Sequence, residues 1–322
     1  MASDHDYLTD FAPVIRSLGV GQMLKSIIGN EITTTDLGHF NAFPLIPTPS
    51  RRGQGALEHE GMTPKRLFDA ARAGGDKVLQ VNHPRAGKLG YFDQLKLSPE
   101  TATSPDKDFV LGFDAIEVFN GKKVSDAQRV LKDWYNFLNL GHRFTATGNS
   151  DTHAVVAQEA GYPRNFIASK TDAPGDIQDK DIIRAIKVER NIVVTNGPFV
   201  AFTVNGKPIG SVVTDTDGKV TLNVVVQAPS WVDVSEIEVI GNGRSLQTIG
   251  VGRIGAAMKT QRTLNVPLTR DTWFVVIARG EESLAPVVPS RGKGPAVTPF
   301  AFTNPIWVDT NGNGKFDPPG LN

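Results

Sequence analysis

The chain of 322 residues contains no cysteine. This absence excludes disulfides, zinc sites built on thiolates and cysteine nucleophiles. It does not decide the cellular compartment, because many periplasmic proteins also lack cysteine. The sequence starts with the polar and acidic stretch MASDHDYLTD, which is unlike a signal peptide. The sequence therefore leaves the compartment open between periplasmic or secreted and cytoplasmic.

An excess of charge and a long apolar run are also missing. The 34 Lys and Arg residues balance the 34 Asp and Glu residues, so the formal net charge is zero. Without a basic run, nothing indicates a nucleic-acid partner or an acidic membrane surface. No apolar stretch approaches the ~20 residues that cross a bilayer, so no membrane span is predicted. The hydrophobic content of 39% is typical of a soluble globular protein, and the length suits roughly two domains.

The N-terminal part of the chain alternates strand-like and helix-like segments. The predicted strands are apolar or β-branched and cover 26–34, 77–82, 114–119, 143–148, 165–168 and 191–194. Helical patterns cover 63–75, 125–141 and 181–190. The first helix has Thr63 as its expected N-cap and Pro64 at its first position. This alternation indicates a parallel sheet or an α/β barrel.

After the stretch TNGPF (195–199) the pattern changes to short alternating strands with Gly and Asn turns. This pattern is typical of a small β-sandwich. We therefore place a domain boundary near residue 197. The predicted domains are an α/β domain over 1–196 and a β-sandwich over 197–322.

Residues that can bind metal ions lie near the ends of the predicted strands. Asp151 and His153 follow RFTATG, and taken alone they are typical of a turn that caps a helix. Glu31 lies near the end of the first predicted strand, and His39 follows it. His83 comes directly after KVLQVN. Because the carboxyl ends of the strands of an α/β barrel converge on one face, we expect these side chains to meet there.

Together with His5, these residues make a set of four imidazoles and two carboxylates. Such a set suits one to three zinc, manganese or iron ions, with a metal-activated water as the nucleophile. A lone histidine after a strand is most often structural, but several on one face favour a metal site. The remaining histidines of the chain, His59 and His142, are expected to be structural. A Ser–His–Asp site is not predicted, because the chain lacks a G-x-S-x-G motif.

The C-terminal stretch DTNGNGKFDPPG matches a calcium loop in part. Asp309, Asn311, Asn313 and Asp317 stand at positions 1, 3, 5 and 9 of such a loop, but Gly320 stands where Glu is usual. No flanking helix pair is predicted. A polar terminal turn is therefore the favoured interpretation, with calcium binding as the alternative.

Several motifs, taken together, resemble a known family. In chain order they are GNEITTTDLGHFNAF, NHPR, AIEVFNG, GNSDTH and TNGPF. They are similar to the polymerase-and-histidinol-phosphatase (PHP) superfamily, and most of all to its carbaryl-hydrolase-like branch of metallohydrolases. The resemblance covers nearly all of the chain. It implies a distorted (β/α)7 barrel that binds up to three metal ions, followed by a small β-sandwich.

The resemblance also implies roles for single residues. Glu31 has the place of the bridging carboxylate, and Arg85 and Asn120 have the placement of groups that contact substrate. The implied metal ligands are His5, Glu31, His39, His83, Asp151 and His153. The first motif of the family, a His-x-His on the first strand, is absent, and only MAS precedes the second. We therefore expect a barrel that is incomplete on its N-terminal side, whose open edge favours self-association.

The leading hypothesis is a metal-dependent hydrolase that acts on a small molecule. It would cleave phosphoester bonds, or the carbamate, ester or amide bonds that the resemblance implies. One alternative is a truncated or catalytically weak metal-binding protein. Another is a non-catalytic recognition module that uses the β-sandwich.

Overall fold

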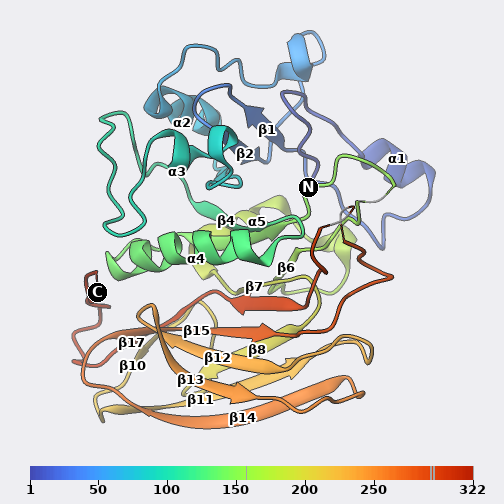
Figure 1. Cartoon of the computed structure of the whole chain (residues 1–322). Coiled ribbons are helices and arrows are strands. Elements are labelled where there is room, and N and C mark those ends of the chain that lie inside the picture. The colour runs from blue at the N-terminus through green and yellow to red at the C-terminus, as the bar shows by residue number, and fades with distance from the viewer. Residues whose placement is uncertain (157, 291, 293, 322) are drawn as a thin grey trace. The chain divides into compact units, whose positions relative to one another are not determined.

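The computed structural model describes residues 1–156, 158–290, 292 and 294–321. The chain divides into two compact units, called unit 1 (Met1–Glu117 with Ile167–Val188) and unit 2 (Val118–Phe166 with Glu189–Asn322). Figure 1 labels most of their helices and strands. The domain boundary near residue 197 stays a prediction, because compact units need not coincide with domains that fold alone.

Unit 1 is built on an open sheet. Its strands are β1 (Asn30–Thr33), β2 (His39–Phe43), β3 (Val78–Val81) and the start of β4 (Ala115–Asn120). β1 pairs with β2 and β2 with β3 in antiparallel fashion, whereas β3 and β4 are parallel. The N-terminal residues extend the sheet beyond β1 through parallel bridges of Ala2 to Ile28 and of His5 to Glu31. Backbone pairing therefore holds His5 beside Glu31.

The register of this sheet separates polar from apolar side chains. Paired residues of neighbouring strands point to the same face, and neighbours along one strand point to opposite faces. Thr33 pairs with His39, Glu31 with Asn41, and Asn41 with Gln80, so these five side chains share one face, called the polar face. The opposite face, called the apolar face, carries Asn30, Ile32, Phe40, Ala42, Leu79 and Val81.

Helices of unit 1 pack against the apolar face. Phe68 of α2 (Pro64–Arg72) meets Phe40 edge to face, with ring centroids 5.2 Å apart. Tyr91 of α3 (Tyr91–Gln94) lies 5.3 Å from the same Phe40 ring. Such aromatic pairs stabilise a core by about 0.5–1.5 kcal/mol beyond the burial of their surface. The other helical segments are α1 (Ala12–Ser17), η1 (Arg52–Gly55), η2 (Gly87–Leu89), η3 (Pro174–Asp176), α5 (Asp179–Arg184) and the π-helical η4 (Ala185–Glu189).

Unit 2 contains the long helix α4 (Val124–Asn139), the end of β4 with β5 (Thr145–Asn149) beside it, and two further sheets. One sheet has the strand order β14-β11-β8-β9. The other has the order β10-β17-β15-β16-β7-β6, and β12 pairs with both β15 and β13. The strands are β6 (Arg164–Ile167), β7 (Ile192–Thr195), β8 (Phe199–Val204), β9 (Lys207–Pro208), β10 (Val212–Thr214), β11 (Lys219–Gln227), β12 (Glu236–Gly241), β13 (Arg244–Gly250), β14 (Met258–Pro267), β15 (Thr272–Arg279), β16 (Phe300–Thr303) and β17 (Ile306–Asp309).

These two sheets of unit 2 share one apolar core. Val200 and Val224 enter it from the four-stranded sheet, and Val239, Phe274 and Val276 enter it from the other. Along β11, buried residues alternate with more exposed ones, which is the period of a strand with one face on a core. Two sheets that face each other across such a core have the arrangement of a β-sandwich.

The predicted (β/α)7 barrel is wrong. No sheet within the described residues closes on itself, and β1, β2 and β3 are antiparallel. The tight turn after β1 is the reason: the Thr34 hydroxyl donates to the carbonyl of Gly38 and accepts from the backbone N–H of Leu37. The chain therefore turns straight back along β1, whereas a barrel needs a crossover that brings the next strand in parallel. The expected self-association depended on the open edge of such a barrel, so the sheets observed here give it no support.

Many of the predicted segments are confirmed within a few residues. The predicted strands from 77–82 onward correspond to β3 through β7. The helix predicted over 63–75 is α2, and Thr63 occupies its N-cap position without a capping hydrogen bond from its side chain. The helix predicted over 125–141 is α4. The described helices are all too short or too polar to span a bilayer. β2, a five-residue strand that contains His39, was not predicted from the sequence.

Candidate metal centre

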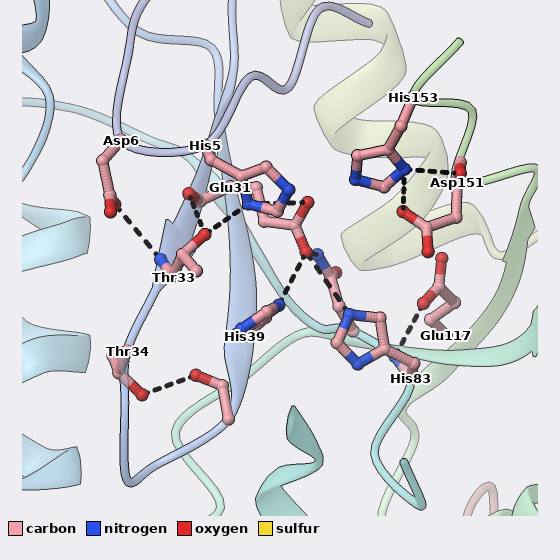
Figure 2. Close-up of polar contacts among 12 residues, drawn as sticks. His5, Asp6, Glu31, Thr33, Thr34, His39, His83, Glu117, Asp151 and His153 are labelled. Atoms are coloured by element: carbon pink, nitrogen blue, oxygen red, sulfur yellow. Dashed lines mark hydrogen bonds and ion pairs between the residues drawn. The ribbon is translucent and has the colours of Figure 1, made fainter. Parts of the chain in front are cut away.

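The side chain of Glu31 lies among three histidines on the polar face of unit 1 (Figure 2). Its Oε1 atom is 3.3 Å from Nδ1 of His39 and 3.4 Å from Nε2 of His83, and its Oε2 atom is 3.6 Å from Nδ1 of His5. Glu31, His39 and His83 are almost completely buried, whereas the side chain of His5 is 43% exposed. The cluster is therefore open to solvent on the side of His5.

Strand pairing brings these residues together. His39 begins β2 and pairs with Thr33. Thr33 stands two residues after Glu31 on β1, so the side chains of Glu31 and His39 both point to the polar face. His5 stands beside Glu31 through its parallel bridge. His83 follows β3 with a positive φ of 26°, and its backbone N–H donates to the carboxylate of Glu117 at 2.6 Å. Of these four residues, only His83 follows the carboxyl end of a strand, where the sequence predicted the site. Glu31 and His39 lie on β1 and β2, and His5 lies in the segment that bridges to β1.

The spacing within the cluster fits a bound cation. Hydrogen bonds from nitrogen to oxygen are usually about 2.7–3.2 Å long, so 3.3 and 3.4 Å are long for such bonds. Donor atoms bound about 2.1 Å from a tetrahedral zinc ion lie about 3.4 Å from one another. Nδ1 of His39 is buried and has no hydrogen-bond partner, although it lies beside Oε1 of Glu31. A metal ion between these two atoms would satisfy both.

The electrostatics favour a charged carboxylate at this position. Burial opposes the ionisation of Glu31, but the side chains of His39, His83 and Asn82 and the charge of His5 together outweigh it. They hold the pKa of the Glu31 carboxyl well below its ordinary value. Glu31 is thus an anion ready to bind a cation at neutral pH.

Two side chains that were not predicted as part of the site orient the cluster. The amide of Asn82 donates to Oε1 of Glu31 at 3.1 Å, and Asn82 in turn accepts from Gln80 at 2.9 Å. The hydroxyl of Thr33 lies 2.6 Å from Nδ1 of His5 and donates to the backbone carbonyl of Glu31. Their signal in the sequence is a polar residue at every second position of an otherwise apolar strand, as in Gln80 and Asn82.

Four further site residues were predicted from the sequence, and each has contacts within its own unit. Arg85, in unit 1, forms an ion pair with Asp93 at 3.1 Å. Asn120 ends β4 in unit 2. Asp151 and His153 also belong to unit 2, where Nδ1 of His153 lies 2.9 Å from the backbone oxygen and 3.7 Å from Oδ1 of Asp151. The roles of these four residues as ligands or substrate contacts stay predictions.

The two histidines expected to be structural have partners of their own. Nε2 of His59 lies 3.2 Å from the Asp6 carboxylate. His142 stacks on the ring of Phe144, with centroids 5.5 Å apart. Burial lowers the pKa of His142, so the imidazole stays neutral at neutral pH.

The C-terminal loop is held by its own hydrogen bonds. Asp309 is fully buried and accepts from the backbone N–H groups of Gly312 and Gly314. The amides of Asn311 and Asn313 both donate to Asp317. These contacts make the polar terminal turn that the sequence favoured, and calcium binding there stays a prediction.

The donor chemistry of the cluster therefore fits a divalent metal ion. Single ligand atoms of His5, Glu31 and His39 all lie within 4.8 Å of one another, and His83 adds a third imidazole. Imidazole nitrogens with one carboxylate are the ligands of many zinc, manganese and iron sites. The residues could hold one ion on unit 1 alone.

No protein-family model matches the chain, and no curated protein matches it. Among solved structures, the chain is similar to the fibronectin(III)-like modules of Clostridium thermocellum CbhA. The identity is 12% and the TM-score is 0.18, over 34% of this chain and 94% of that one.

Proposed function

We propose that this protein is a metal-dependent hydrolase whose centre is the Glu31 cluster of unit 1. The observation that carries the proposal is a buried carboxylate with three imidazole nitrogens 3.3–3.6 Å from its oxygens. The donor set favours zinc, with manganese or iron as the other ions it suits. The motifs GNE, GHFN and NHP add their similarity to metallohydrolases of the PHP superfamily.

A divalent ion bound there would supply Lewis acidity toward a substrate oxygen and toward water. The substrate would be a small molecule with a phosphoester bond, or with a carbamate, ester or amide bond. The chain's own residues would hold the ion and keep it in place. Glu31 contributes the negative charge, Asn82 fixes one oxygen of its carboxylate, and Thr33 fixes the ring of His5.

Substrate would reach the cluster from its exposed side. His39 and His83 are too buried to leave room for a substrate around their rings, whereas the side chain of His5 is 43% exposed. Arg85, which belongs to unit 1, remains the proposed contact to the substrate, through the charge of its guanidinium. The role of Asn120 rests on the sequence resemblance alone.

Metal loading tests the proposal directly. The purified chain is stripped with a chelator, dialysed against zinc, manganese or iron(II), and analysed for bound metal. We expect at least one equivalent of metal on the native chain and almost none on Glu31→Gln. The control is His142→Gln, which removes an imidazole far along the chain from the cluster and should leave the metal content unchanged.

Activity is then measured on the loaded chain. Bis(p-nitrophenyl) phosphate and 1-naphthyl methylcarbamate represent the phosphodiester and the carbamate class. Turnover that is present with metal, and lost in Glu31→Gln, supports the hydrolase. Metal binding without turnover of either substrate class would favour the alternative, a metal-binding protein without catalysis. Equal metal content of the native chain and Glu31→Gln would overturn both.

A further inference from the structure

The side chain of His83 lies on a face of the sheet that the preceding strand does not predict. Neighbours along β3 alternate between the two faces, with Gln80 on the polar face and Val81 on the apolar face. In a continued strand, His83 would follow Val81 to the apolar face. Its Nε2 atom instead lies 3.4 Å from Oε1 of Glu31, on the polar face. A local change of backbone direction therefore brings this imidazole into the cluster.

The backbone changes direction at His83 itself. Its φ is 26°, whereas the φ of a strand residue is about −120°. A positive φ is uncommon for any residue other than glycine, because the Cβ atom crowds the backbone carbonyl oxygen. The carbonyl of His83 accepts from the N–H of Ala86 at 3.0 Å, which closes a turn directly after it. A strained conformation of this kind persists only where the surrounding structure holds it.

The carboxylate of Glu117 binds the N–H of this strained residue (Figure 2). Its Oε2 atom accepts from the N–H of His83 at 2.6 Å, and such bonds to a carboxylate are shorter and stronger than those to a neutral acceptor. Gln80 of β3 pairs with Ala115 of β4, so Glu117, two residues further along β4, also points to the polar face. Glu117 is buried. Because a buried carboxylate is costly without hydrogen bonds, the bond to His83 resists being broken.

We propose that Glu117 is a positioning residue of the metal centre. It holds the backbone of His83 in the conformation that turns the imidazole toward Glu31. The inference rests on the proposed metal-binding function, and it assigns Glu117 no contact with the ion or the substrate. Groups that orient a ligand in this way typically change metal affinity about 10–100-fold when they are removed. The position of the ring and the affinity for zinc are measured separately, so that failure of this inference and failure of the proposed function can be told apart.

The position of the His83 ring is measured in the metal-free chain. The rings of His39 and His83 meet edge to face with centroids 4.9 Å apart, so their protons should give a nuclear Overhauser cross-peak in a histidine-labelled sample. We expect this cross-peak in the native chain and its loss in Glu117→Ala. It should return in Glu117→Gln, because the amide oxygen can still accept from the N–H of His83. A cross-peak that persists in Glu117→Ala would overturn the inference.

Asp114→Ala is the matched control. The Asp114 carboxylate accepts from the backbone N–H of Leu79 at 2.9 Å, so this variant loses the same kind of hydrogen bond near the start of β3. The cross-peak between His39 and His83 should remain in Asp114→Ala. If it is lost there as well, the cause is general loosening of the sheet, and the inference fails.

Zinc affinity is then measured by competition with a chelator. Glu117→Ala should bind zinc about 10–100-fold more weakly than the native chain, whereas Glu117→Gln should keep most of the affinity and Asp114→Ala all of it. In a His83→Ala background, Glu117→Ala should have no further effect, because it acts through His83. Equal affinity of the native chain and Glu117→Ala, or the same loss in both backgrounds, would overturn the inference and leave the proposed function intact. A native chain that shows the cross-peak but binds no metal would overturn the proposed function alone.

Glu117→Gln decides the question if Glu117→Ala does not fold. The N–H of His83 faces a carboxylate in the native chain and a neutral amide oxygen in this variant. Its proton signal should therefore move upfield, because the hydrogen bond to a neutral acceptor is weaker. An unchanged signal would show that Glu117 is not the partner of this N–H, and the inference would fail.

Discussion

The Nδ1 atom of His39 lies 3.3 Å from Oε1 of Glu31, and it is buried without a hydrogen-bond partner. This distance is longer than a good hydrogen bond and close to the separation of two atoms that share one metal ion. Both residues are fixed by the backbone pairing of β1 with β2. A cation bound between these two atoms, as proposed, would therefore add to the stability of the folded chain.

Zinc should stabilise the native chain but not His39→Gln. Binding to the folded state alone adds about 2.7 kcal/mol to the free energy of unfolding when free zinc is 100 times its dissociation constant. We expect this gain for the native chain and for the control His142→Gln, measured by urea unfolding with and without zinc. His39→Gln lacks one ligand, so its free energy of unfolding should barely change on adding zinc. A full gain in His39→Gln would show that zinc binds elsewhere.

Asn82 should act through Glu31. Its amide donates to Oε1 of Glu31, and loss of such a supporting hydrogen bond typically weakens metal affinity about 10–100-fold. We therefore expect a change of this size for Asn82→Ala in competition titrations with a zinc chelator. Asn41→Ala is the matched control, because Asn41 is a buried amide on the same face of the sheet. If both variants lose the same affinity, the effect is general loosening of the sheet and not positioning of Glu31.

Gly38 should be intolerant of a side chain. Its φ is 89°, and a Cβ atom there would lie 2.5 Å from the backbone nitrogen of Tyr91. We expect Gly38→Ala to lower the free energy of unfolding by about 2–5 kcal/mol, because backbone strain adds to the clash. Gly61→Ala isolates the strain alone, since Gly61 has a φ of 69° but no atom near the added Cβ. Its expected cost is about 1–2 kcal/mol, and equal losses in urea unfolding would contradict the clash.

Tyr91 should make the chain sensitive to alkaline pH. Burial raises the pKa of its phenol well above the ordinary value, although the hydrogen bond with Val110 opposes this. A group whose pKa is raised by folding stabilises the protein fully below its unfolded pKa of about 10, and this contribution is lost as the pH rises through the folded pKa. We expect the free energy of unfolding of the native chain to fall above about pH 10. In Tyr91→Phe the slope should be smaller.

The same variant is informative at neutral pH. The Tyr91 hydroxyl donates to the carbonyl of Val110 and accepts from its N–H, so Tyr91→Phe should cost about 1 kcal/mol there. Tyr7→Phe, at an exposed tyrosine, serves as the comparison. An unchanged alkaline slope in Tyr91→Phe would assign the pH sensitivity to other groups.

Most of the secondary structure could be predicted from local patterns. α2 and α4 follow the 3.6-residue period, as the burial of Trp134 and Phe137 in α4 illustrates. β2 could not be predicted as a strand from its neighbours, because it is five residues long and mixes His39 and Asn41 with Phe40. Only its pairing on both sides with β1 and β3 makes it a strand. The predicted barrel failed for the same reason: alternating segments do not reveal whether successive strands run parallel.

The sequence by itself determined which residues can bind a metal ion and which segments form helices and strands, because side-chain chemistry and hydrophobic period are local properties. Tertiary structure alone decided which of those residues meet. His39 faces Glu31 because the turn at Thr34 to Gly38 reverses the chain, and His5 joins them through a bridge to Glu31. Pairing between strands depends on hydrogen bonds between segments distant in the chain, so no local pattern contains it.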